Sequence, residues 1–151
     1  MKWPRRWLRP WLTATLLVGG TIAAHAADDV GQVKIARGQV TIERAGQMLP
    51  AQVGMALEAA DILRTGGDGS IGVTMRDDSL LSAGPNSVLS LAHFEFDPTT
   101  SQGRFESRLQ RGTLALVSGR IAKSSPQAMT VRTPSAVLGV RGTDLLVSVH
   151  D

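Results

Sequence analysis

The chain has 151 residues, with 16 lysines and arginines against 13 acidic residues, and it contains neither cysteine nor tyrosine. One domain is expected at this length, and the lack of cysteine excludes disulfides, thiolate catalysis and zinc–thiolate sites. Four of the sixteen basic residues lie in the first ten positions, so the remainder carries twelve basic against thirteen acidic residues. This balance excludes a basic nucleic-acid-binding domain.

The first 26 residues have the three parts of a secretory signal peptide. A basic start precedes an apolar stretch over residues 11–24, and Ala24 and Ala26 offer small side chains where signal peptidase requires them. The stretch has about 14 residues, whereas a membrane-spanning helix needs about 20. We therefore predict a signal peptide over residues 1–26, cleavage near Ala26, no retained membrane span, and one periplasmic or secreted domain over residues 27–151.

The N-terminal half of this domain consists of short segments that alternate apolar and polar residues. Residues 31–35 and 38–42 flank a turn that contains Gly38, and this pattern predicts a hairpin. Residues 55–60 are expected to form a single helical turn. Further short strands, each bounded by turn residues, are expected at 62–64, 70–76 and 79–82.

The C-terminal half continues with a longer strand over residues 88–96 and a hairpin loop over residues 97–103. Residues 118–127, which contain glycine, serine and proline, are expected to form a mobile loop. The remaining strands are expected at 104–109, 112–117, 129–133, 136–140 and 143–149. About ten short strands at this spacing predict an all-β fold, a sandwich or barrel-like roll, with one short helical turn at most.

Side chains that often carry chemistry form no catalytic pattern in this sequence. His93 and His150 have no second histidine at metal-ligand spacing, and Ser70 and Ser79 lack the surroundings of an activated nucleophile. A calcium site is the weaker alternative for four aspartates near turns, whose spacing matches no known calcium loop: Asp61, Asp68, Asp77 and Asp78. We predict no catalytic residue, no metal and no cofactor, and thus a non-enzymatic domain.

Two arginines, Arg132 and Arg141, stand at strand ends in the otherwise apolar C-terminal region. An arginine between buried strands needs a carboxylate or several carbonyl groups as partners. Asp61 and Asp78 are the expected partners. A structural role for the two arginines is therefore favoured over ligand binding.

Several short motifs occur in a fixed order through the domain. They are VKIARGQVTI (33–42), LEAADILRTG (57–66), DGSIGV (68–73), DDSLLSAGPNS (77–87), GTL (112–114) and VRTPSAVLGVRGT (131–143). The ordered set, which ends in Thr-Pro and Arg-Gly-Thr, resembles the FecR-type domain family, the periplasmic domain named after the regulator of iron–dicitrate transport. Asp78 stands where relatives more often have glycine, so a strained turn is expected there.

The resemblance implies a signalling role. Full-length regulators of the family combine a cytoplasmic anti-sigma segment, one membrane helix and this domain, which receives a signal from an outer-membrane transporter. Without a cytoplasmic segment or a retained helix, direct control of a sigma factor is not expected. We instead predict a protein-interaction or signalling module of the bacterial envelope. The alternative is a glycan- or peptidoglycan-binding module, which a domain without tryptophan or tyrosine disfavours.

The expected partner is an envelope protein, with no nucleic acid involved, and a second copy of the chain is the alternative. The last strand, over residues 143–149, is apolar and is expected to offer an open edge for strand pairing. The candidate partner-binding residues on and near this strand are Arg132, Arg141, Thr143, Leu145 and Val147.

Overall fold

A computed structural model describes residues 28–142 and 144–150. The predicted signal peptide and the candidate residue Thr143 lie outside the described residues. The described residues form twelve strands and one short helix: β1 (Asp29–Arg37), β2 (Val40–Arg44), β3 (Gln47–Pro50), β4 (Ala56–Glu58), β5 (Ile62–Thr65), β6 (Ser70–Met75), β7 (Leu80–Ala83), β8 (Val88–Phe96), β9 (Gly103–Val117), α1 (Arg120–Ser124), β10 (Met129–Arg132), β11 (Val137–Gly139) and β12 (Asp144–Val149). The predicted all-β fold with at most one short helical turn is confirmed.

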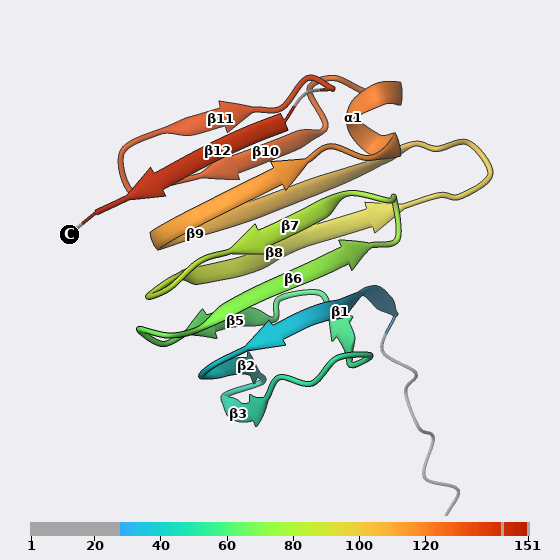
Figure 1. Cartoon of the computed structure of the whole chain (residues 1–151). Helices are drawn as coiled ribbons and strands as arrows, with labels where there is room; N and C mark the ends of the chain where they lie inside the picture. Colours follow the sequence, from blue (N-terminus) through green and yellow to red (C-terminus); the bar gives the residue numbers. More distant parts are fainter. Residues whose placement is uncertain (1–27, 143, 151) are drawn as a thin grey trace, which may run out of the picture.

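The strands form one curled sheet whose two halves lie against each other as layers (Figure 1). The front layer has the order β4-β1-β6-β7-β9-β12, and the back layer has the order β3-β2-β5-β8-β9-β10-β11. Among the described residues, β9 and β10 run parallel and all other paired strands are antiparallel. Strand β9 belongs to both layers and so connects them.

Strand β9 passes from the back layer to the front layer at Gly112. Its residues up to Arg111 pair with β8, and the residues from Gly112 onward pair with β12. Gly112 has a φ of +90°, and a Cβ atom there would lie 2.2 Å from Ser87 Oγ, so the bend requires glycine. The two separate strands predicted at 104–109 and 112–117 are therefore one continuous strand, because the glycine bends the chain without ending the pairing.

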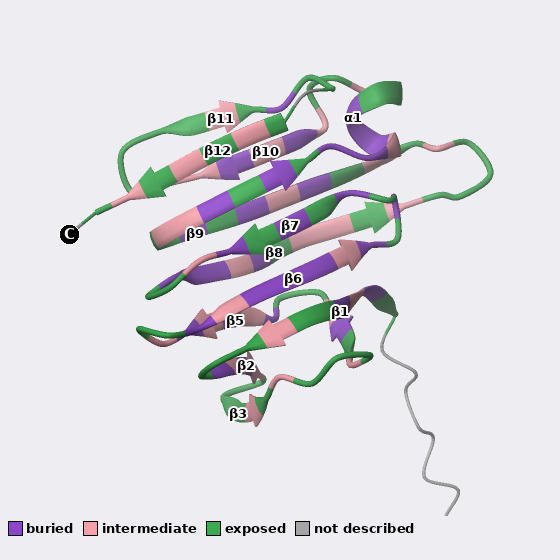
Figure 2. Ribbon diagram, in the orientation of Figure 1, coloured by how far each residue is buried: buried purple, intermediate pink, exposed green. Residues whose placement is uncertain are grey.

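The core lies between the two layers and is built from alternate residues of each strand. The inner side chains of both layers form a single buried cluster, which appears as purple bands along the strands in Figure 2. Val73 and Leu116 belong to the front layer, whereas Leu63 and Phe105 belong to the back layer. Burying each side chain of this size stabilises the fold by about 1.5–3 kcal/mol, so the alternating pattern drives the layers together.

The predicted hairpin between residues 31–35 and 38–42 is wrong. Strand β1 pairs with β4 and β6 in the front layer, whereas β2 pairs with β3 and β5 in the back layer. The turn itself is present: Gly38 has a φ of +64°, and the backbone N–H of Gln39 donates to Asp68 Oδ1 at 3.1 Å. It carries the chain from one layer to the other. Alternation alone does not separate these cases, because both arrangements bury one face of each strand.

The helical turn predicted at 55–60 is also wrong, since these residues contain the short strand β4. Leu57 is fully buried there, opposite Gly31 of β1, and this pairing extends the front layer. The helix α1 instead lies inside the segment predicted as a mobile loop. Its first turn is held by the backbone N–H of Arg120, which donates to the Asp77 carbonyl at 2.7 Å, and its apolar residue Ile121 is buried.

Candidate interaction surface

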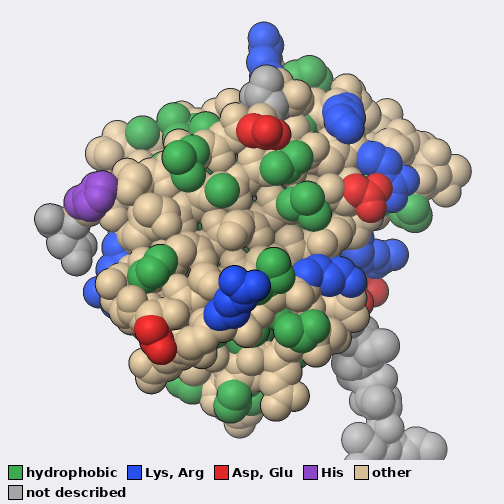
Figure 3. All heavy atoms as spheres, in the orientation of Figure 1, with side chains coloured by type: hydrophobic (Ala, Val, Ile, Leu, Met, Phe, Trp, Pro, Cys, Tyr) green, Lys and Arg blue, Asp and Glu red, His purple; other side chains and the backbone are tan. Residues whose placement is uncertain are grey.

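The outer surface of the front layer, called the front face below, exposes large apolar side chains. Ile35 and Leu80 are each 47% exposed, Val117 is 43% exposed and Leu146 is 77% exposed. They come from β1, β7, β9 and β12. For Leu80, Val117 and Leu146 the outward direction follows from strand alternation, because the neighbouring residues of each strand point into the core. Ile35 follows a bulge in β1, where both it and Lys34 are exposed. Figure 3 shows hydrophobic side chains spread over this face.

The centre of the front face forms a depression because its side chains are small. The strand registers place five residues in one row across the layer: Ile35, Gly72, Ser82, Ala115 and Leu146. A hollow of about 300 Å³ lies over the three small residues of this row, beside Leu80 and Val117. A shallow apolar depression with larger apolar residues at its ends is suited to contact with another protein surface.

Charge on the front face is confined to its two opposite sides. Lys34 and Arg37 are exposed on β1, and Asp144 is exposed on β12. Figure 3 shows blue side chains over β1 and a red one over β12, with further red and blue side chains around the edge of the face. Within residues 28–142 and 144–150, none of these three groups has an ion-pair partner. The Lys34 ammonium donates to the Gln32 side chain of its own strand.

The outer surface of the back layer, called the back face below, has paired charges instead. The Arg64 guanidinium lies 2.7 Å from the Glu43 carboxylate, and the Arg132 guanidinium lies 2.7 Å from the Glu106 carboxylate. Arg104 is a second, more distant partner of Glu106, at 3.8 Å. Each of the two 2.7 Å pairs joins neighbouring strands, so these charges neutralise one another within the chain. Arg108, beside Arg132 on the same face, is exposed and takes part in none of the ion pairs of the described residues.

Arg132, a candidate residue, is therefore paired with Glu106, and the expected pairing of Arg132 or Arg141 with Asp61 or Asp78 is wrong. The guanidinium of Arg44 holds Asp61, and Arg120 lies 3.1 Å from the Asp78 carboxylate. The long side chain of Arg44 reaches Asp61 because β2 and the turn after β4 lie at the same end of the two layers. Sequence distance gave no indication of this contact.

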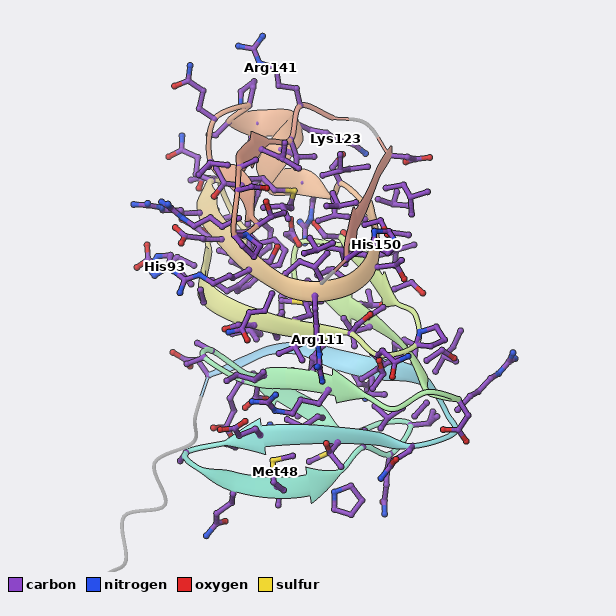
Figure 4. All side chains as sticks on the ribbon, turned by 90° about the vertical axis from the view of Figure 1, so that its left-hand side faces the viewer. Met48, His93, Arg111, Lys123, Arg141 and His150 are labelled. Atoms are coloured by element: carbon purple, nitrogen blue, oxygen red, sulfur yellow. The ribbon has the colours of Figure 1, made fainter. Side chains whose placement is uncertain are left out.

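Arg141 lies in the turn between β11 and β12 and projects from one end of the molecule (Figure 4). Leu145 and Val147 lie on β12 but point inward, where they are half-buried against the core. Leu146, which sequence reasoning missed, is the β12 residue that points outward and is exposed. Residues 145–147 are all apolar, but by alternation Leu146 shares its side of the strand with the polar residues Asp144 and Ser148, and this was the signal that it would face outward.

Asp77, Asp78 and Ser79 have structural roles in the turn before β7. The Ser79 hydroxyl donates to Asp77 Oδ2 at 2.7 Å and accepts the backbone N–H of Gly119 at 2.9 Å, and both side chains are fully buried. This contact attaches α1 to the turn before β7. In that turn Asp78 has a φ of +66°, in agreement with the strain expected where relatives have glycine.

Asp61 is also buried and holds Arg44 in a two-pronged contact. Arg44 Nε donates to Oδ1 at 2.9 Å and its second nitrogen donates to Oδ2 at 2.7 Å, while Glu58 adds a 2.7 Å contact. The hydrogen bond to Asp61 raises the pKa of Arg44 above its ordinary value, against the opposing effect of burial. The three charged groups thus connect β2 of the back layer to the end of β4 in the front layer.

The two histidines of the described chain are separated. His93 lies on β8, and His150 follows β12, on opposite sides of the molecule in Figure 4. Across the part of the chain that the structure describes, no three histidine, aspartate or glutamate side chains gather in a metal-binding arrangement. No helix formed by the described residues is both long and apolar enough to cross a membrane.

Fold and surface define an all-β, two-layered domain with an apolar front face and a charged back face. A family model described as FecR protein matches residues 61–151, from just before β5 through the end of β12. The match covers more than half of the chain, and the chain belongs to the FecR protein family. Comparison with curated proteins and with solved structures found no match.

Proposed function

We propose that the chain is a regulatory or signalling domain of the bacterial envelope that acts by binding another protein through its front face. Membership of the FecR family supports the regulatory role. The observation that carries the choice of surface is the row of apolar and small residues across the front face, with a hollow at its centre and large exposed apolar side chains around it. Among the described residues, Lys34 and Asp144 at its two sides have no ion-pair partner, whereas Glu43 and Glu106 of the back face are paired within the chain.

The energetics of the front face support a binding role. Leu146 and Ile35 each expose about half or more of their surface to solvent at opposite ends of one row. Covering apolar surface contributes about 25 cal/mol for each Å² removed from water. A contiguous apolar area that remains exposed in a single copy of a domain often indicates an interaction site.

The proposal also holds that the domain has no catalytic activity. The Asp77 carboxylate and the Ser79 hydroxyl are hydrogen-bonded to each other, are fully buried and hold α1 in place. Their hydrogen bonds give both groups a structural use. An envelope location is supported by the signal-like sequence of residues 1–26 and by the family, which is periplasmic in general.

A crosslinking pull-down from intact envelopes tests the proposal. The full chain, tagged after residue 26, is compared with two variants that each place a glutamate at an exposed apolar position: Leu80→Glu on the front face and Val137→Glu on β11 of the back layer, where Val137 is 58% exposed. A protein that is recovered with the unmodified chain and with Val137→Glu, but not with Leu80→Glu, supports the proposal.

Equal recovery with both variants would show that the front face is not the binding surface. Recovery that disappears only after glycan digestion would favour glycan binding and contradict the proposal. Far-UV circular dichroism of both variants checks that each remains folded.

A further inference from the structure

We propose that the partner of the front face is a second copy of the chain, packed face to face about a two-fold axis that runs along β7. This inference rests on the proposed function in one respect, namely that the front face binds protein. It adds the identity of the partner and the orientation in which the partner lies.

The order of the strands places β7 at the middle of the exposed part of the front layer. Of the described strands, β6, β1 and the three-residue β4 lie on one side of β7, and β9 and β12 lie on the other, while the exposed apolar residues come from β1, β7, β9 and β12. Leu80 and Ser82 are the outward residues of β7. An axis along this strand therefore brings Leu80 of one copy next to Leu80 of the other.

Two simple two-fold arrangements pack a pair of sheets face to face with aligned strands. In one, the axis runs across the strands, so that β1 lies over β1 and β12 lies over β12. In the other, the axis runs along the strands, so that β1 of each copy lies over β12 of its partner. The distribution of charge distinguishes the two.

An axis across the strands sets like charges against each other, because both basic side chains of the rim, Lys34 and Arg37, are on β1. An axis along the strands sets Lys34 of one copy against Asp144 of the other. The registers place these two residues close to the same height. The row of Asp144 runs across β9, β7 and β6 through Val117, Leu80 and Thr74 and ends on β1 at Gln32, two residues from Lys34. Lys34 and Asp144 of one face are thus complementary to Asp144 and Lys34 of a second copy.

The apolar residues agree with the same axis. Ile35 and Leu146 lie at opposite ends of the central row, so Ile35 of one copy lies over Leu146 of the other. Between them Gly72, Ser82 and Ala115 keep the surface low, and this lets two sheets approach to normal packing distance. One rotation therefore covers all four exposed apolar residues of both copies.

Cysteine crosslinking tests contact at the axis, and the chain suits it because it contains no cysteine. In the full chain, Leu80→Cys is expected to form a covalent dimer under mild oxidation or with a short bis-maleimide. Val137→Cys, at an apolar position off the front face that is at least as exposed as Leu80, serves as the matched control and is expected to stay monomeric. Equal crosslinking of the two variants would overturn the proposal.

A charge reversal tests the orientation. By sedimentation equilibrium, Lys34→Glu and Asp144→Lys are each expected to raise the dimer Kd about tenfold, since each breaks two symmetric pairs. The double variant is expected to recover most of the affinity, because its reversed charges again face each other. Additive weakening in the double variant would overturn the axis along β7.

Failure of this inference is distinguishable from failure of the proposed function. If the unmodified chain is monomeric at high concentration while an envelope protein is still lost with Leu80→Glu, the second copy is not the partner and the proposed function stands. If the chain is monomeric and Leu80→Glu loses nothing, both are overturned.

Discussion

The two outer faces of this domain are made by the same curled sheet, yet their charged and apolar side chains are arranged differently. On the back face, carboxylates and guanidinium groups of neighbouring strands pair within the chain, as Glu106 does with Arg132. On the front face, the middle strands present Leu80, Val117 and small residues, with charge only at the sides. Glu43 and Glu106 of the back face thus have partners within one copy of the chain, whereas the proposed binding would cover the apolar groups and rim charges of the front face.

The two faces exist because β9 bends at Gly112 and so contributes one half of its length to each layer. We expect Gly112→Ala to lower the free energy of unfolding by about 3–5 kcal/mol, because alanine is strained in the left-handed backbone conformation and its Cβ atom would clash with Ser87. Urea unfolding followed by circular dichroism measures this, since the only tryptophans lie in residues 1–11. Gly139→Ala is the control, because no atom lies within 4 Å of a Cβ there. A loss as small as that of the control would show that the bend tolerates a side chain.

The next largest effect is expected at the charged contact that joins the layers. Asp61→Ala leaves Arg44 without its buried partner and should cost about 3 kcal/mol of stability. Glu58→Ala removes the more exposed carboxylate from the same arginine and should cost at most about 1 kcal/mol. The two losses are compared in the same urea assay. If the two variants lose the same amount, burial of Asp61 is not what gives this contact its strength.

Ion pairs on the back face should contribute less to the free energy of unfolding than the Arg44–Asp61 contact, because solvent reaches their charges. Glu106→Gln is expected to lower the free energy of unfolding by about 0.5–1 kcal/mol in dilute buffer, and by less at high salt, where surface ion pairs are screened. Measuring the variant and the unmodified chain at two ionic strengths tests this. A loss that does not change with salt would contradict an electrostatic role for the Glu106–Arg132 pair.

The smallest effect on stability is expected on the front face. At concentrations low enough to avoid association, Leu80→Glu should change the free energy of unfolding by no more than about 0.5 kcal/mol, because the side chain lies on the surface. A loss comparable to that of Asp61→Ala would show that the front face stabilises the single copy, and the contrast between the two faces would then disappear.

Some elements could be predicted from the sequence because their signals are local. The loop over residues 97–103 connects β8 and β9 as expected, since aspartate, proline and glycine there favour a turn between two strongly alternating segments. The left-handed Asp78 was indicated by comparison with the family motif. The short strand β4 could not be predicted, because a three-residue strand has no period and depends on its pairing with β1.

The candidate surface was predicted less well than the fold. The last strand was expected to matter, and it does border the front face, but the named residues Leu145 and Val147 point inward and Leu146 points outward. Strand alternation requires that neighbours point to opposite sides. The side that faces solvent was indicated by Asp144 and Ser148, which alternate with Leu145 and Val147 and share their side of the strand with Leu146.

The sequence by itself determined the all-β class, most strand positions and the resemblance to the FecR family, because alternation, turn residues and short motifs act over a few neighbouring positions. Only the tertiary structure decided that β1 and β2 lie in different layers, that β9 serves both, and that Ile35, Leu80, Val117 and Leu146 share one face. These features depend on which strands pair across the whole chain, and the burial of a common core selects that pairing.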